Sequence, residues 1–222
     1  MNMSSQCLWE KGGSVDINPI SIVLQQVSSR KMETLLACVC EGLGEGSDAA
    51  TQSGYLTERL VEWCHQKDLK KLLEQGREAE ITKSLEAELE RCLYELGQYG
   101  KKKGSMEIQY SGVLIRNNQC WIFQRGATGL LLFNRRYGKE HIRPLVLPPE
   151  ANVWEGRVQK NVGILLCDEA FGEILDREDF IEVLFQDKKY EEERMGKRLK
   201  ELWREGKERG LKKTGAVFVR TY

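Results

Sequence analysis

The sequence predicts an α+β protein in which strands and helices occupy separate stretches of the chain. Two strand-like runs come first, two stretches with helical spacing follow, and a second group of strand-like runs precedes the last helices and a closing strand. Alternating single strands and helices would indicate a parallel sheet, whereas grouped elements are typical of α+β proteins.

The bulk composition sets limits on domain number and partners. A chain of 222 residues with 41% hydrophobic residues can bury one full core, so a single domain is expected over residues 12–222, after an N-terminal tail at 1–11. The 34 basic and 34 acidic side chains cancel, which predicts neither nucleic acid nor a membrane as a partner. The sequence shows no apolar run of membrane-spanning length and no secretory signal pattern, so a cytoplasmic location is expected.

The N-terminal half is expected to hold a hairpin and two helices. Residues 20–25 and 33–41 are short β-rich runs joined by a polar turn. Asp48 is a candidate cap for a helix over 48–65, and leucines at helical spacing predict a second helix over 82–97.

The C-terminal half is expected to be rich in strands. Runs at 107–116, 119–124 and 129–136 predict an antiparallel meander, with a turn at Asn117 and Asn118. A buried strand within 161–171 and a helix opened by Asp176 follow. The spacing of apolar side chains then predicts a last helix before a closing strand at 216–222, and this helix carries Met195, Leu199, Leu202 and Trp203.

The order of these segments resembles the metal-dependent serine/threonine protein phosphatases, the type 2C or PPM-type family. "GGSVDINPIS" resembles the family's G-x-x-R-x-x-N-E-D start, and "VCEGLGEG" its A-D-G-M-G-G. "RGATGLLLF" is similar to G-D-S-R-x-Y-L-L, and "LLCDEAFGEIL" to L-L-C-S-D-G-L-x-x-x-L. A weaker match is "ERGLKKTGAVFVR" to the family's ending. The resemblance implies two stacked antiparallel β-sheets flanked by helix pairs on both faces.

The resemblance also implies a metal centre built from carboxylates. In the family, carboxylates hold two divalent cations, Mn²⁺ or Mg²⁺, that bind phosphate and activate a water. The family's aspartates fall here on Glu41 and Glu169, each one methylene longer, with Asp168 one place out of register. Gly42 matches the family's backbone-carbonyl ligand. The candidate metal residues are therefore Glu41, Gly42 and Glu169.

Other positions of that centre depart from the family. Its first aspartate falls on Ile20, and its last falls on Lys212, or on Lys213 with a different gap. The phosphate-gripping arginine falls on Val15, and the aspartate of G-D-S-R falls on Ala127. Because an apolar residue and a lysine replace two carboxylates, no cofactor is expected, and the lysine would compensate the charge of the remaining acids.

Two rival sites have weaker support. Cys38, Cys40 and Cys167, with the pair Cys64 and His65, could be imagined as a zinc or redox site, but buried strand cysteines are usually packing residues in the reduced state. The basic stretch "RLKELWREGKERGLKK" could suggest an RNA or membrane contact, although a helix with a solvated charged face is the simpler interpretation.

Two functions of different classes follow from the sequence. The favoured one is a catalytically inactive phosphatase-like protein, a pseudophosphatase, that binds a protein such as a kinase or a phosphoprotein in phospho-signalling. The alternative is an active, divergent phosphoserine/phosphothreonine phosphatase that uses Glu41, Gly42 and Glu169 around Mn²⁺ or Mg²⁺. Fold alone does not separate them, because function depends on the site.

Overall fold

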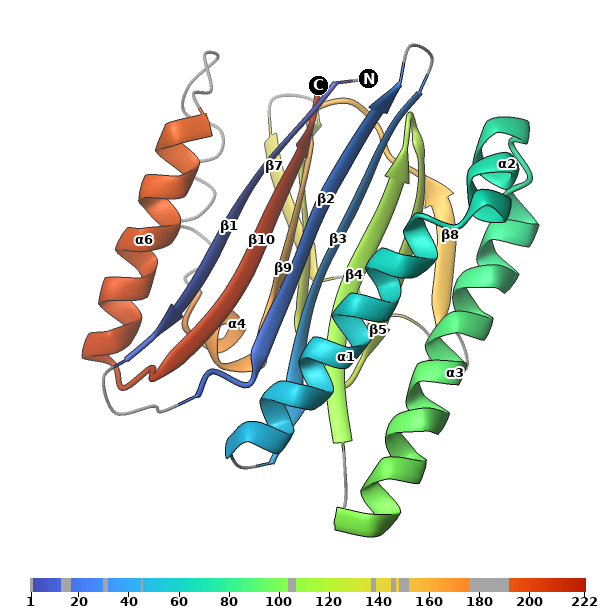
Figure 1. Ribbon diagram of the computed structural model, residues 1–222. Helices are drawn as coiled ribbons and strands as arrows, with labels where there is room; N and C mark the ends of the chain where they lie inside the picture. Colours follow the sequence, from blue (N-terminus) through green and yellow to red (C-terminus); the bar gives the residue numbers. More distant parts are fainter. Residues whose placement is uncertain are drawn as a thin grey trace.

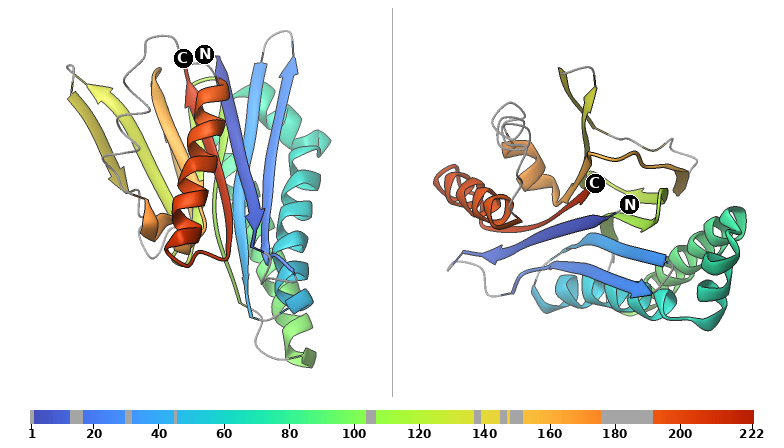
Figure 2. Two further views of the ribbon diagram at one scale, coloured as in Figure 1. Left: turned by 90° about the vertical axis from the view of Figure 1, so that its left-hand side faces the viewer. Right: turned by 90° about the horizontal axis from the view of Figure 1, so that it is seen from above.

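Two antiparallel sheets are stacked face to face, with helices on both outer faces (Figures 1 and 2). The computed structural model describes residues 2–12, 17–29, 32–44, 46–103, 107–136, 139–144, 147, 152–175 and 192–222. Within these ranges each sheet has five strands. The α+β sandwich expected from the sequence is confirmed.

One sheet carries the predicted N-terminal hairpin. Its strand order is β2-β3-β4-β5-β8, and β2 pairs with β3 antiparallel, as expected. Asn117 has a positive φ of 53° in the turn between β4 and β5, a conformation that asparagine tolerates well. The strands of this sheet are β2 (Ile20–Ser29), β3 (Met32–Leu43), β4 (Glu107–Arg116), β5 (Gln119–Arg125) and β8 (Val153–Arg157).

The second sheet has the order β1-β10-β9-β6-β7. Its strands are β1 (Met3–Lys11), β10 (Lys213–Thr221), β9 (Val162–Cys167), β6 (Gly129–Arg136) and β7 (Lys139–Pro144). Residues 1–11 were expected to be a tail, whereas most of them form β1, which pairs with β10 along its whole length. Met3 and Leu8 are buried on opposite faces of β1, so the sequence lacks the simple alternation that reveals a strand.

The predicted three-stranded meander is wrong at its third strand. β4 and β5 form a hairpin, but β6 pairs with β9 and β7 in the other sheet. The chain leaves β5 through Gly126, whose φ of 79° favours glycine, and crosses to the second sheet within three residues. Sequence pattern alone does not distinguish such a crossing from a hairpin, because both need a short turn with glycine.

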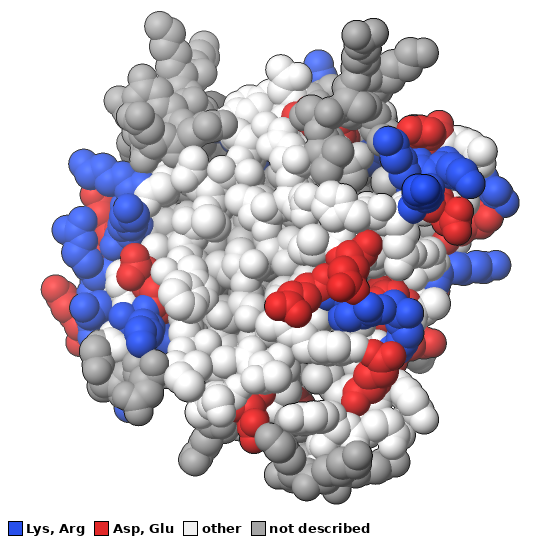
Figure 3. Space-filling view, in the orientation of Figure 1, with Lys and Arg blue, Asp and Glu red and all other residues white. Residues whose placement is uncertain are grey.

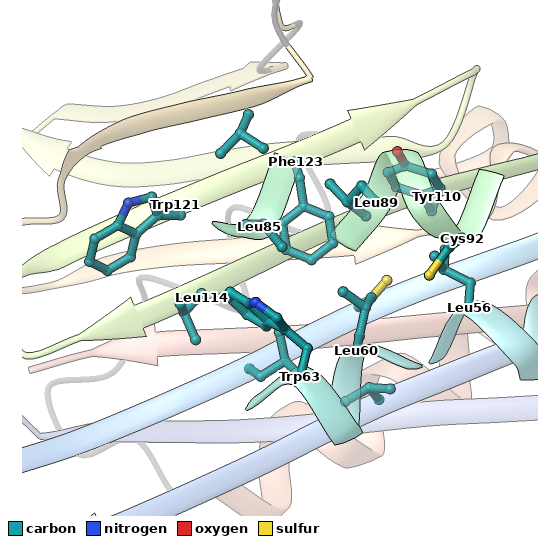
Figure 4. Close-up of a cluster of buried hydrophobic side chains, with 14 of the residues drawn as sticks. Leu56, Leu60, Trp63, Leu85, Leu89, Cys92, Tyr110, Leu114, Trp121 and Phe123 are labelled. Atoms are coloured by element: carbon teal, nitrogen blue, oxygen red, sulfur yellow. The ribbon is translucent and has the colours of Figure 1, made fainter. Parts of the chain in front are cut away.

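Three helices cover the outer face of the β2–β3–β4–β5–β8 sheet. They are α1 (Gly46–Cys64), α2 (Lys67–Gln75) and α3 (Glu78–Lys103). The two predicted helices are confirmed, although α3 extends beyond 82–97 at both ends. The short α2 was not expected; it ends at Gly76 in the left-handed conformation, with φ 66°. Figure 4 shows the core between these helices and the sheet, which contains Leu56, Leu60, Trp63, Leu85, Leu89, Cys92, Tyr110, Leu114, Trp121 and Phe123.

The helices α4 (Glu169–Ile174) and α6 (Glu192–Glu208) cover the other sheet. Phe171, Leu199 and Leu202 are buried beneath them, against Phe133 and Phe218 of the sheet. The predicted placement of early and late helices on opposite faces is thus confirmed (Figure 2). The helix expected from Asp176 lies outside the described residues. Among the described helices, none is both long and apolar enough to cross a bilayer.

Apolar side chains from both sheets fill the space between them. Ile20, Val39, Val113, Leu166 and Val217 are fully buried there. Gly215 of β10 faces this space, and a Cβ on it would overlap the side chain of Ile20. Ile20 therefore fills the volume that this glycine leaves open.

The cysteines of the strands are core residues. Cys38, Cys40 and Cys167 are completely buried, and burial raises the pKa of each thiol. Cys64 is partly exposed, and its neighbour His65 accepts a hydrogen bond at Nε2 from the Gln25 side-chain amide. Within the described ranges, no three or more His, Cys, Asp or Glu side chains are grouped so as to hold a metal ion.

Thiol labelling tests this description of the cysteines. In the native protein, Ellman's reagent should react rapidly at Cys7, which is exposed, and not at Cys38, Cys40 or Cys167, because a buried thiol with a raised pKa gives little thiolate. The rapid phase should disappear in Cys7→Ser. Labelling of the three strand cysteines within minutes, located by peptide mass spectrometry, would contradict the core assignment.

A second prediction concerns the close packing of Gly42 against α1. A Cβ on Gly42 would overlap the backbone carbonyl of Ala49, which cannot move without shifting the helix. Gly42→Ala should therefore lower the free energy of unfolding by about 1–3 kcal/mol. The matched control is Gly97→Ala in α3, where a Cβ would meet open space and the expected change is a gain of roughly 0.5–1 kcal/mol. Urea unfolding measures both; equal stability of the two variants would contradict the prediction.

Candidate functional site

The candidate site lies at one end of the sandwich, where both sheets contribute polar residues. Glu41 is near the end of β3, Gln109 near the start of β4, and Lys213 is the first residue of β10. Glu169 is the first residue of α4, directly after β9. In Figure 1 the first turn of α1, the start of β10 and α4 mark this end of the molecule, in the lower part of the view.

Glu41 is held from both sides of the sandwich. It is 7% exposed, and its Oε1 lies 2.6 Å from Nζ of Lys213, which comes from the opposite sheet. Its Oε2 accepts a hydrogen bond of 2.8 Å from Nε2 of Gln109. Both carboxylate oxygens therefore have a donor, one charged and one neutral.

The side-chain amide of Gln109 joins the two candidate carboxylates. Its Nε2 also lies 3.4 Å from Oε2 of Glu169, while its Oε1 accepts a 3.2 Å hydrogen bond from the backbone N–H of Ala127. Gly126 allows the turn to approach this closely, because a Cβ there would lie 2.6 Å from Cβ of Gln109. Glu41, Glu169 and Ala127, three positions implied by the resemblance, are thus brought together around a residue that the sequence analysis did not select.

The lysine at this site is Lys213, and the first placement at Lys212 is wrong. Adjacent residues of a strand point to opposite faces, so only one of the two can face Glu41. Lys213 makes the ion pair, whereas the side chain of Lys212 is exposed and its carbonyl accepts from Gly12 N–H. The alternative gap placement was the correct one.

Ile20 lies directly opposite Glu41 in the β2–β3 ladder, where the resemblance places an aspartate. It is 1% exposed and belongs to the apolar core between the sheets. Its N–H donates to Oδ1 of Asn18, and its C=O accepts from Nε1 of Trp9. The side chain thus offers no ligand atom, and Asn18 secures the backbone. Val15 lies outside the described residues.

Asp168 fixes the position of Glu169. Its Oδ1 caps α4 by accepting from Phe171 N–H, and its Oδ2 accepts from Thr214 Oγ1 and Gly215 N–H of β10. The carboxyl is completely buried, and this burial raises its pKa, although the three hydrogen bonds act in the opposite direction. Asp168 is therefore a structural cap, and the side chain of Glu169 is left exposed beside it.

Gly42 follows Glu41 at the site and donates its N–H to the carbonyl of Pro19. Its close contact with α1 gives it a packing role.

Gln109 is the residue that sequence reasoning missed, and the capping role of Asp168 was not predicted. Gln109 is a polar residue in an apolar strand, and such buried amides need hydrogen-bond partners, which is a signal that the sequence offered.

The comparisons with known proteins agree on the fold. No family model matches the sequence, and no curated protein does. Among solved structures, the S. agalactiae serine/threonine phosphatase has 17% identity and a TM-score of 0.74 over 100% of both chains. Mycobacterium tuberculosis PstP has 14% identity and a TM-score of 0.72, covering 99% of this chain and 98% of its own. PppA of Pseudomonas aeruginosa has 15% identity and a TM-score of 0.70, covering 100% and 99%. The chain therefore has the fold of the bacterial type 2C serine/threonine phosphatases.

Proposed function

We propose that this chain is a phosphatase-like protein without turnover, which acts in phospho-signalling by binding a protein partner such as a kinase or a phosphoprotein. The observation that carries the proposal is the 2.6 Å contact between Lys213 Nζ and Glu41 Oε1. An ammonium group so close to the carboxylate supplies positive charge that a bound cation would otherwise supply. It does so without a ligand, so the charge of Glu41 is compensated within the protein itself.

The donors at the site do not fit a two-cation centre. Mg²⁺ needs near-octahedral oxygen ligands at about 2.0–2.1 Å, and two cations need several shared carboxylates. Both oxygens of Glu41 already accept from other groups, and Ile20 contributes no oxygen. Glu169 alone has room, since it is exposed. For this reason these residues do not support a phosphate-cleaving step.

The active alternative requires a rearranged site. A cation held by Glu41, Gly42 and Glu169 would have to displace both Lys213 and Gln109 from Glu41. An isolated ammonium left beside the metal would then repel it, which weakens binding further. Metal titration distinguishes the two functions.

The binding role rests on what the fold does in its neighbours. The proteins of similar structure are serine/threonine phosphatases, and one of them, PppA, is described as a regulatory component of a type VI secretion system. A protein phosphatase must contact the protein that it acts on, and such a contact does not itself depend on the chemistry, because function lies in the site and not in the fold. The partner proposed here is accordingly a protein, and the centre contributes rigidity to the surface around it.

Metal titration tests the absence of a cation centre. Isothermal titration calorimetry with Mn²⁺ and with Mg²⁺ should show no saturable heat of binding at low millimolar metal. The reason is that Lys213 and Gln109 already contact both carboxylate oxygens of Glu41. Hydrolysis of p-nitrophenyl phosphate should not exceed that of buffer containing the same metal, with an active type 2C phosphatase assayed in parallel. Micromolar Mn²⁺ binding that is lost in Glu41→Ala would overturn the proposal in favour of the divergent phosphatase.

Rebuilding the carboxylates tests the role of Lys213 specifically. The triple variant Glu41→Asp, Glu169→Asp, Lys213→Asp should acquire divalent-metal binding, because it removes the ammonium and adds a carboxylate at the same place. At ten times the Kd, Mn²⁺ should stabilise it by about 1.4 kcal/mol, which for a chain of this size raises Tm by roughly 3–6 °C.

The matched control replaces Lys212 instead of Lys213 in the same triple variant. It has the same net charge and the same two aspartates, but it keeps the ammonium that faces residue 41. Its Tm should not respond to Mn²⁺. Equal metal responses of the two triple variants would show that Lys213 does not block the site.

A further inference from the structure

The open side of the sandwich presents two edge strands, β1 and β2. Each is the first strand in the order of its sheet and pairs on one side only, β1 with β10 and β2 with β3. In Figure 1 both strands lie toward the front of the molecule, with β10 seen between them, α6 on one flank and α1 on the other. Figure 3 shows a broad uncharged area on this face, bordered by charged side chains on the side of α6 and by acidic and basic side chains that reach toward the middle of the view from the side of α1.

The β2 strand lacks the protection that exposed edges usually have. Charged side chains, proline or a bulge normally keep an edge strand from pairing with another chain. The sequence of β2, ISIVLQQVSS, contains no charged residue and no proline, although 31% of the whole chain is charged. Its ladder with β3 runs in unbroken register from Ile20 to Ser29, without a bulge.

The middle of β2 directs free backbone groups outward. Gly42 N–H donates to Pro19 C=O, which shows that Pro19 and every second residue after it bond to β3. The intervening residues Ile22, Leu24 and Gln26 therefore point their N–H and C=O groups away from the sheet. Within the described part of the chain, no residue bonds to these groups.

The free segment is closed at the end nearest the candidate site. The backbone N–H and C=O groups of Ile20 also point away from β3, but the N–H donates to Oδ1 of Asn18 and the C=O accepts from Nε1 of Trp9. The segment with free backbone groups therefore runs from Ile22 to Gln26, and Leu24 is its middle residue. Ile22 and Leu24 are partly buried against the core between the sheets, and Gln26 is exposed.

We infer that β2 pairs with β2 of a second copy of this chain, antiparallel, about a two-fold axis at Leu24. In this register Leu24 faces Leu24 of the second copy, and Ile22 faces Gln26 in both directions. Each of the three residues then exchanges hydrogen bonds with its opposite, as in any antiparallel ladder. The two β2–β3–β4–β5–β8 sheets become one continuous sheet across the axis.

Charge and symmetry favour a second copy over a foreign peptide. The chain has a formal net charge of zero, so two copies approach without long-range repulsion. An edge that binds a foreign strand selects it through charges or side-chain pockets, and β2 carries no charge for this purpose. A two-fold axis needs only a segment whose outward backbone groups match those of its own copy, and the N–H and C=O groups of Ile22, Leu24 and Gln26 do so about Leu24.

The neighbouring edge adds contact area to the same interface. Met3 of β1 faces the space between the sheets, so Ser5, Cys7 and Trp9 lie on that same face, at the open side beside β2. Cys7 and Trp9 are exposed, and Trp9 reaches across to β2 through its bond to Ile20. A second copy on β2 would therefore also lie beside Trp9 of β1.

Sedimentation equilibrium of the whole chain tests the inference. At roughly 100 µM the wild type should sediment with twice the mass of one chain, as expected for an interface of ordinary size. Leu24→Lys places two ammonium groups opposite each other, and Gln26→Lys adds charge without touching the core. Each should weaken the dimer by at least about tenfold. The matched control Gln98→Lys makes the same change at an exposed position of α3 and should leave the mass unchanged.

Disulfide capture tests the register independently of stability. In a Cys7→Ser background, Leu24→Cys should form a disulfide-linked dimer under mild oxidation, because residues directly opposite have Cβ atoms about 4.5–5.5 Å apart. Gln98→Cys in the same background should stay monomeric on a non-reducing gel. A wild type that is monomeric throughout, or a dimer that Leu24→Lys and Gln26→Lys both leave intact, overturns the inference. A monomer that binds an unrelated β-strand peptide through β2 also overturns it, in favour of a foreign partner.

Discussion

The ion pair between Lys213 and Glu41 is the interaction on which the polar end of this sandwich depends. The space between the two sheets is filled by aliphatic side chains, and a charge in such a place is costly unless it is paired. Lys213 comes from one sheet and Glu41 from the other, so the pair also joins the sheets. Since the lysine side chain is 29% exposed, solvent screens the pair, and its loss costs less than the about 3–5 kcal/mol typical of fully buried pairs.

Other features of the site follow from this pair. Gln109 satisfies the second oxygen of Glu41 and ties the turn at Ala127 to it. Asp168 anchors the start of α4 to β10 next to Lys213, which keeps Glu169 at the rim. The site thus consists of two hydrogen-bonded groups, one around Glu41 and one around Asp168, which are joined through the chain at Lys213–Thr214 and at Asp168–Glu169. Satisfied polar groups of this kind make the surface around them rigid.

Much of the fold was accessible from the sequence because the strands have strong local signals. The bounds predicted for 107–116 and 129–136 coincide with β4 and β6, where long aliphatic runs end in charged residues. Which sheet β6 joins was not accessible, since the decision lies in the crossing after Gly126 and in pairing with β9, far along the chain. β1 was missed because its two buried residues lie on opposite faces of the strand. α2 was missed because a helix of nine residues has too few turns for apolar residues to recur at helical spacing.

The site was predictable in composition but not in contacts. The resemblance placed Glu41, Glu169 and a lysine together, and the geometry brings Glu41 and Lys213 into contact. Neighbouring residues of an extended chain point in opposite directions, so a shift of one residue in the alignment decides whether Lys212 or Lys213 faces Glu41. Gln109 belongs to no motif, so only the three-dimensional contacts identify it as the link between the two acids.

The packing of Ile20 over Gly215 limits the order in which a carboxylate centre could be built at this site. A carboxylate introduced at residue 20 alone would leave a cavity over the glycine and place a charge among Val39, Val113 and Val217. Each single step toward a carboxylate centre would therefore lower stability before any cation could bind and restore it. With a branched side chain filling this space, the order in which substitutions are made decides whether the intermediate proteins stay folded.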